Sequence, residues 1–198
     1  MNATQQILKF LEKNHIIRPR DLDPYNIPRE YLRRLHMRGI LRRVGWGLYV
    51  LENGKEMEQQ TLIEACKRVP QGVLCLLTAL QYHEITAQMP FDVWMAIDRK
   101  SWLPQVDHPR IRFMRFSGLA LTEGIVEHDV SGVTIRVYNP AKTVADCFKY
   151  RNKIGLDVAI EALRDGYRTR KFNVDEIMKY SKVCRVANVI KPYLESII

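Results

Sequence analysis

The sequence lacks any apolar stretch of about 18 residues and any secretory leader pattern, so it predicts neither a membrane span nor export. Cysteine is scarce: four are scattered along the chain, without a C-x-x-C pair or a histidine at ligand spacing. Such scattering favours buried, reduced thiols over a zinc site or a disulfide framework. We therefore expect a cytoplasmic protein that has no structural metal.

The short signatures of common catalytic sites are missing as well: GxGxxG, the P-loop, GxSxG and HExxH do not occur. One triplet, Asp98-Arg99-Lys100 after an apolar strand, has the D-x-K form that metal nucleases of the PD-(D/E)xK type use. Its nearest second carboxylate, Asp92, lies about 20 Å away along an extended strand. Asp107 or Asp129 could serve only if the fold brought either one close. We predict no enzyme activity, no cofactor and no metal site.

Positive charge is present in excess and is unevenly distributed. The net charge of the 198 residues is +9. Residues 1–51 hold ten Lys/Arg against four Asp/Glu, whereas residues 52–198 hold 21 against 18. The first quarter of the chain thus carries two-thirds of the net charge, which favours a polyanionic partner for that quarter.

The stretch 27–50, IPREYLRRLHMRGILRRVGWGLYV, predicts a helix followed by a β-hairpin. Leu32 and Leu35 recur at helical spacing, and Pro28 suits a first helical turn. Gly39 stands where a helix would end in a left-handed residue. The runs LRRV and LYVL around a glycine-rich turn are typical of a hairpin.

The residues before this stretch complete a known order of elements. Thr4 can cap a helix that reaches about Asn14, and a weak helix is expected at 19–22. The segment 24–26 predicts a turn, and its Asn26 can cap the next helix. The expected order within about 50 residues is helix, short helix, turn, helix and hairpin. This is the order of a winged helix-turn-helix. A solvated basic helix packed on a hairpin is the alternative without DNA. We place this domain at 1–51 and the domain boundary at the polar break 52–55.

A helix of this kind enters the major groove with its N-terminal residues leading. Arg29 and Arg33 lie opposite the apolar face and could reach base edges, ideally guanine O6 and N7. Arg34 and Arg38 are better placed for phosphates, and Tyr31 could face either the core or a phosphate.

The hairpin adds further candidate residues for contact with DNA. Arg42 and Arg43 alternate faces, so only one of them is expected to point at DNA. Trp46 at the tip could wedge against the sugar-phosphate edge or fold back onto the second domain. The predicted DNA-binding residues are Arg29, Tyr31, Arg33, Arg34, Arg38, Arg42, Arg43 and Trp46.

Residues 52–198 predict an α+β domain with a small, mostly antiparallel sheet and C-terminal helices. Expected strands are 91–97, 111–116, 124–128 and 132–138, and expected helices are 57–69, 140–150, 155–167, 174–182 and 187–198.

Two stretches of this domain resemble a known family. Residues 76–85, LLTALQYHEI, resemble the leucine-rich "TAL…H" helix of the AbiEi family of bacterial antitoxins. Residues 138–147, YNPAKTVADC, resemble the later helix of that family, which opens at a proline and carries a small residue-Asp pair. The hairpin LRRVGWGLYV resembles the regulator half of the same family. The likeness covers nearly the whole chain, in the same order.

This resemblance implies an antitoxin of a type IV toxin–antitoxin system linked to abortive phage infection. Such proteins repress their own operon by binding repeats in its promoter. Their toxin resembles a nucleotidyltransferase and is countered without a stable protein complex, by an activity attributed to the second domain. Repeats match two-fold symmetry, so a dimer or two monomers per site are both possible.

Simpler interpretations stand beside the resemblance. Leu76, Leu77 and Leu80 suit core packing better than a ligand surface, and Asn139 before Pro140 is a helix cap on physical grounds alone. An alternative function is a protein-interaction module, in which the second domain binds a toxin or phage component without sequence-specific DNA binding.

Overall fold

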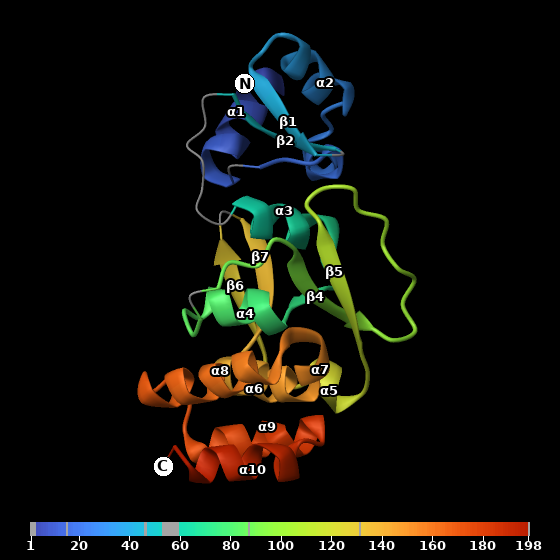
Figure 1. The fold of residues 1–198 in the computed structure, drawn as a ribbon. Helices are drawn as coiled ribbons and strands as arrows, with labels where there is room; N and C mark the ends of the chain where they lie inside the picture. The colour runs from blue at the N-terminus through green and yellow to red at the C-terminus, as the bar shows by residue number, and fades with distance from the viewer. Residues whose placement is uncertain are drawn as a thin grey trace.

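The computed structural model describes residues 3–14, 16–45, 47–52, 60–86, 88–130 and 132–197. It places a small helical unit with a hairpin at one end, a five-stranded sheet in the middle and a layer of C-terminal helices at the other end (Figure 1). No helix within the described ranges is long and apolar enough to cross a membrane.

The N-terminal unit packs its helices around a small apolar core. Ile7 and Leu11 of the first helix, Leu22 of the 3-10 helix and Leu32 and Leu35 of the next helix are almost inaccessible to solvent and share one cluster. Their spacing of three and four residues puts them on one side of each helix. The elements are α1 (Ala3–Asn14), η1 (Pro19–Tyr25), α2 (Glu30–Met37), β1 (Leu41–Gly45) and β2 (Leu48–Leu51).

The larger sheet has the strand order β5-β4-β3-β7-β6. Strands β3/β4 and β6/β7 pair antiparallel, whereas β3/β7 and β4/β5 pair parallel. Its strands are β3 (Val73–Leu74), β4 (Val93–Asp98), β5 (Ile111–Phe116), β6 (Ile125–Val130) and β7 (Val133–Tyr138).

Strand β4 shows how both faces of this sheet are covered. Its residues alternate between two cores: Trp94 and Ala96 face one, and Val93, Met95 and Ile97 face the other. A strand buried on both faces reads as a continuous apolar run, as this one does.

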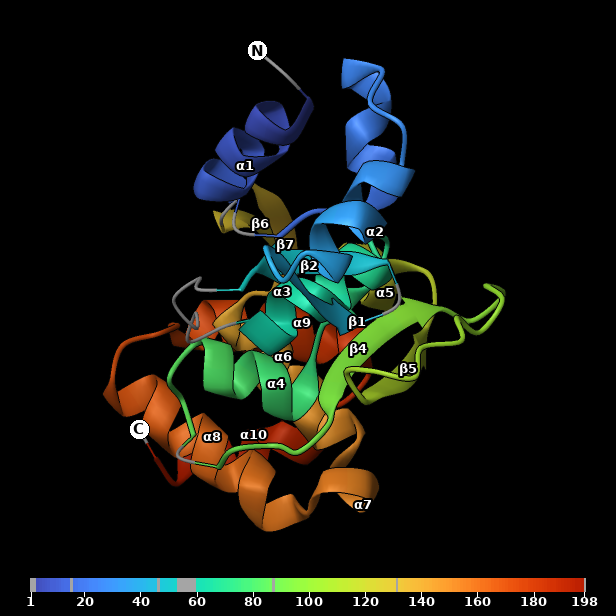
Figure 2. The ribbon, with the colours of Figure 1, turned by 90° about the horizontal axis from the view of Figure 1, so that it is seen from above.

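Helix α3 (Gln60–Arg68) and the hairpin cover one face of the sheet. Leu48 and Val50 of β2 share a core with Ile63 of α3 and with the sheet residues beneath it. Viewed from above, β2 lies over α3 (Figure 2). The N-terminal unit is therefore held to the rest of the chain by a continuous apolar core.

The other helices cover the opposite face. Helix α6 is central among them: it contacts α4, α8, α9 and α10, and every residue from Ala141 to Phe148 is buried. Asn139 caps it by accepting a hydrogen bond from the Lys142 amide at 2.9 Å, as predicted. The helices of this part are α4 (Leu76–Tyr82), α5 (Leu119–Thr122), α6 (Pro140–Lys149), α7 (Arg151–Ile154), α8 (Leu156–Arg168), α9 (Val174–Cys184) and α10 (Ala187–Glu195).

The predicted fold class is confirmed, with details that the sequence did not supply. The larger sheet is mixed rather than mostly antiparallel, because β3 and β4 each take one parallel neighbour. The short helices α5 and α7 were not predicted. Leu76 and Leu80 are fully buried and Leu77 is partly buried against the same cluster, which confirms the core-packing interpretation of the leucine-rich segment. Asn26 was predicted to cap α2; instead it ends η1 in a left-handed conformation.

Some predicted elements include residues that the structure does not describe. These are positions 57–59, Ser131 in the predicted hairpin turn and Ile198.

His83, directly after α4, gives the fold a pH dependence. Its Nε2 lies 2.7 Å from the carbonyl oxygen of Tyr138. Burial lowers the pKa of His83 below its ordinary value, and the nearby charges of His128 and Lys171 act in the same direction. The unfolded chain therefore binds a proton more readily than the folded chain at this residue. This contribution to stability is present above pH 6.5 and is lost as the pH falls toward the folded-state pKa.

We expect the urea midpoint of the wild type to fall between pH 7 and pH 5, and the fall to be smaller in His83→Gln. A glutamine can still donate to the Tyr138 carbonyl but does not titrate. Equal pH dependence in the two proteins would show that His83 is not responsible.

Candidate nucleic-acid interface

Helix α2 separates its apolar and charged residues onto two faces. Leu32 and Leu35 are each 1% exposed and pack on the core of the N-terminal unit. Arg33, Arg34 and Arg38 are exposed. In Figure 1, α2 lies at the end of the molecule farthest from the C-terminal helices. The helix thus presents an arginine-bearing face to solvent.

The end of α2 fixes the direction in which the chain enters the hairpin. Gly39 has φ = 69°, and the amide of Ile40 donates to the carbonyl of Leu35 at 3.0 Å. This is the hydrogen bond of a Schellman motif, and the left-handed conformation that the sequence predicted for Gly39 is confirmed. His36 adds a contact of 2.9 Å between its Nδ1 and the carbonyl oxygen of Leu41, the first residue of β1.

Substituting Gly39 tests this geometry. We expect Gly39→Val to lower the free energy of unfolding by about 1–2 kcal/mol, because a β-branched residue is strained at positive φ. Gly39→Asn is the control, since asparagine tolerates this conformation, and it should lose less. Urea unfolding followed by circular dichroism measures both. A valine variant as stable as the asparagine variant would contradict the assignment.

Arg29, predicted to reach a base edge, is held by an acidic neighbour. Its Nη2 lies 2.8 Å from Oδ2 of Asp23, and its Nε lies 3.3 Å from Oδ1 of the same carboxylate. This hydrogen bond and the charge of Asp23 raise the pKa of Arg29. The pair is exposed, so the carboxylate competes with any anion that approaches this guanidinium.

Arg34 and Tyr31 form a second local group. The Arg34 guanidinium lies 4.9 Å from the Tyr31 ring centroid and 3.5 Å from Oε1 of Glu30. Tyr31 is half-buried and packs partly on the apolar core. The ring therefore contacts both the arginine and the core, and its contact with a DNA phosphate stays a prediction.

The remaining predicted arginines differ in their surroundings. Arg33, Arg38 and Arg42 have no acidic partner in the part of the chain that the structure describes. The register places Arg42 opposite Val50 and Arg43 opposite Tyr49, so they alternate faces as predicted. Arg43 is near enough to Arg68 of α3 for its charge to contribute to lowering the Arg68 pKa, behind the larger effect of burial. Trp46 lies outside the described residues, so its two predicted roles stay open.

The hairpin is anchored below by a third strand segment. Ile17 and Tyr49 exchange backbone hydrogen bonds of 2.9 and 3.0 Å, which form an isolated antiparallel bridge next to β2. A two-stranded ribbon is marginally stable by itself, so this bridge and the core beneath Leu48 hold it in place.

Charged residues reinforce the junction between the N-terminal unit and α3. Nζ of Lys67 donates to the carbonyl of Ile16 at 2.7 Å and lies 2.9 Å from Oδ2 of Asp21. Arg18 donates to the carbonyl of Lys67 and also pairs with Asp21. Burial alone would raise the pKa of Asp21, but the hydrogen bonds from Lys67 and the Arg18 amide leave it below its ordinary value. This network fixes the N-terminal unit against α3.

Sequence reasoning missed this junction because its partners are about 50 positions apart. Only the local spacing of Arg18 and Asp21 could have indicated one half of it, because a carboxylate three positions on can accept from a backbone amide at the start of a helix, as Oδ2 of Asp21 does from the Arg18 amide at 2.8 Å.

The D-x-K triplet, Asp98-Arg99-Lys100, begins at the last residue of β4. Oδ1 of Asp98 accepts a hydrogen bond from the Lys100 amide at 2.7 Å, which closes a turn. Asp92 pairs instead with Arg110 and Arg112, at 3.4 and 3.1 Å. Within the described ranges, no group of three or more His, Cys, Asp or Glu residues could hold a metal ion.

Comparison with known proteins agrees with this arrangement. Residues 5–51 match a family model described as a transcriptional regulator, AbiEi antitoxin. The match covers α1, η1, α2 and the hairpin. No curated protein matches the chain. The resemblance noted in the sequence is therefore confirmed for the N-terminal quarter of the chain. Residues 5–51 are similar to the transcriptional regulators of the AbiEi antitoxin family.

Proposed function

We propose that this protein represses transcription of its own operon by binding double-stranded DNA through residues 1–51. The observation that carries the proposal is the two-faced helix α2, whose leucines pack on the core while Arg33, Arg34 and Arg38 remain exposed at one end of the molecule. In a helix-turn-helix, this is the helix that enters the major groove. Residues Arg33 and Arg29 are assigned to base edges, and Arg34, Arg38 and one wing arginine to phosphates.

The ion pair between Arg29 and Asp23 refines this assignment. To reach guanine, Arg29 must exchange its carboxylate partner for base acceptors, so part of its gain offsets the lost pair. Arg33 has no such partner among the described residues and gains fully from a base contact. We therefore assign the larger share of base discrimination to Arg33.

Residues 52–198 are proposed to carry the antitoxin activity of a type IV system, against a nucleotidyltransferase-like toxin and without a stable complex. The family match at residues 5–51 supports this through the kind of regulator it describes. DNA binding through α2 and antitoxicity through the rest of the chain should then be separable by substitution.

A promoter–reporter assay tests both parts. The wild type should repress a reporter placed behind the DNA upstream of its own gene, and Arg33→Ala should lose most of that repression. The same variant should still rescue growth when it is expressed with a nucleotidyltransferase-like toxin of the same operon. Full repression by the variant would refute the role of α2, and loss of rescue at normal protein levels would refute the division of labour. Absence of repression by wild type would favour a protein-interaction module.

A further inference from the structure

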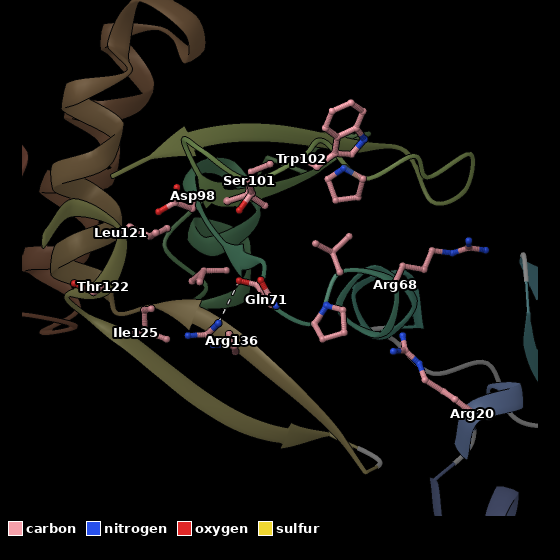
Figure 3. A pocket seen from close by; sticks show the side chains of 15 residues that line it. Arg20, Arg68, Gln71, Asp98, Ser101, Trp102, Leu121, Thr122, Ile125 and Arg136 are labelled. Atoms are coloured by element: carbon pink, nitrogen blue, oxygen red, sulfur yellow. Dashed lines mark hydrogen bonds between the residues drawn. The ribbon is translucent and has the colours of Figure 1, made fainter. Parts of the chain in front are cut away.

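A cleft of about 660 Å³ lies beside the end of α3, and residues of both the N-terminal unit and the sheet line it (Figure 3). Its lining includes the apolar side chains of Val73 and Ile97 of the sheet. The volume lies within the range of small-molecule sites in proteins, which is about 300–1,000 Å³. None of the residues that line this cleft is among those assigned to DNA contacts above.

Two arginines lie at one end of the cleft. Arg68 comes from the last turn of α3, and Arg20 comes from η1 of the N-terminal unit (Figure 3). Nε and Nη2 of Arg68 are buried, and neither has a hydrogen-bond partner among the described residues. Buried donors without acceptors are costly, so this guanidinium is prepared for an acceptor that the described chain does not provide.

The charges that the structure describes around Arg68 do not provide hydrogen-bond acceptors for its Nε and Nη2. Burial lowers the pKa of Arg68, the charges of Glu64 and Asp107 oppose this effect, and the charge of Arg43 adds to it. Arg20 is exposed and has no acidic partner within the described ranges, and its charge lowers the pKa values of Arg18 and Lys67. This end of the cleft therefore holds two guanidinium groups, and the carboxylates of Glu64 and Asp107 are near enough to Arg68 to act on its pKa.

The edge of the cleft offers an aromatic surface. Trp102, in the loop after β4, is 91% exposed although its indole is large and mostly apolar. In Figure 3 it lies between the arginine end and the end marked by Asp98, Leu121 and Thr122. An exposed indole beside a basic end can stack on a planar base while the phosphates of the same ligand reach the guanidinium groups.

The polar groups along the cleft determine how a ligand with phosphates would be oriented in it. The Asp98 carboxylate, which accepts a hydrogen bond from the Lys100 amide, would repel a phosphate. Arg136, near that end, already donates to the carbonyl of Gln71 at 3.2 Å and pairs with Glu127. The Asp98 end is therefore less favourable for phosphates than the end with Arg20 and Arg68.

We propose that this cleft binds a nucleoside diphosphate, with its phosphates on Arg20 and Arg68 and its base on Trp102. The ligand would touch both the N-terminal unit and α3, so it would strengthen the junction that Lys67 and Asp21 form.

Calorimetric titration of the full chain tests the site with four probes: ADP, GDP, pyrophosphate and a single-stranded octanucleotide. We expect both diphosphates to bind, and Arg68→Met to weaken them about tenfold or more, as the loss of charged hydrogen bonds implies. Arg20→Met should weaken them as well. Trp102→Leu should weaken the diphosphates and leave pyrophosphate unchanged. Arg164→Met, an exposed arginine on α8, is the matched control and should bind like wild type.

Three results would overturn the proposal: no binding of either diphosphate at millimolar concentration, equal binding by wild type and Arg68→Met, or binding of the octanucleotide alone. The last would show that the cleft takes nucleic acid rather than a free nucleotide. Thermal unfolding of each variant shows whether it is folded, and the highly exposed Trp102 provides a test that does not depend on the junction.

Discussion

Replacing Lys142 by methionine is expected to destabilise the protein by about 3–5 kcal/mol, because it leaves the Asp146 carboxylate buried without its counter-ion. Both side chains are fully inaccessible, and their Nζ and Oδ2 atoms are 2.5 Å apart within α6. Burial raises the pKa of Asp146, and the Lys142 charge and hydrogen bond oppose that rise. Cys184 donates its Sγ–H to the other carboxylate oxygen at 3.1 Å. Urea unfolding of wild type and variant measures the loss.

A double variant separates the charge effect from packing. Lys142→Met combined with Asp146→Leu removes both charges and should recover most of the stability lost by the single variant, because well-packed apolar residues often replace a buried ion pair without cost. The Tyr138 ring, 4.1 Å from Nζ of Lys142, would then contact a methionine side chain. A single variant within about 1 kcal/mol of wild type would contradict the account, since that is below the cost of an unpaired buried charge.

Replacing Arg33 by alanine should weaken binding to the operator by about 1–3 kcal/mol, or roughly 5- to 150-fold, and relax the preference for one base pair. Arg33 is exposed on α2 and has no acidic partner among the described residues, so its guanidinium is available to guanine acceptors. A fluorescence anisotropy titration with the operator and with single-base variants of it measures both effects.

Two other substitutions give this experiment its controls. Arg34→Ala should weaken binding to all duplexes about equally, because a phosphate contact carries no base preference. Lys191→Ala, on α10 in the C-terminal helical layer, should bind like wild type. If Arg33→Ala lost the same affinity for every duplex, Arg33 would be a phosphate contact and the assignment of base readout would be wrong.

Local patterns predicted most of the elements because they depend on short-range chemistry. Gly39 ends α2 and Asn139 begins α6 as expected, since both residues act through backbone groups within four positions. Strand β5 coincides with the predicted 111–116. The arginine pattern of α2 was visible for the same reason, because exposed and buried positions of a helix follow from its period.

Long-range pairings were not predictable in the same way. The parallel pairing of β4 with β5 depends on a connection that crosses over, and no residue in either strand specifies it. Likewise, neither Arg29 nor Asp23 carries a signal for their ion pair, and the contacts of Lys67 with Ile16 and Asp21 join distant parts of the chain. The candidate nucleotide cleft consists of residues from η1, α3, the sheet and the loop after β4, so it exists only once the chain is folded.

The most direct test of the central claim is a titration of the full chain against two duplexes of equal length at two salt concentrations. One duplex is the DNA upstream of its own gene, and the other is its scrambled counterpart. We predict tighter binding to the upstream duplex, with affinity for both falling steeply as salt rises, because several arginines displace counter-ions from phosphates. Equal affinity for the two duplexes, or no binding to either, would contradict the claim that α2 reads promoter DNA.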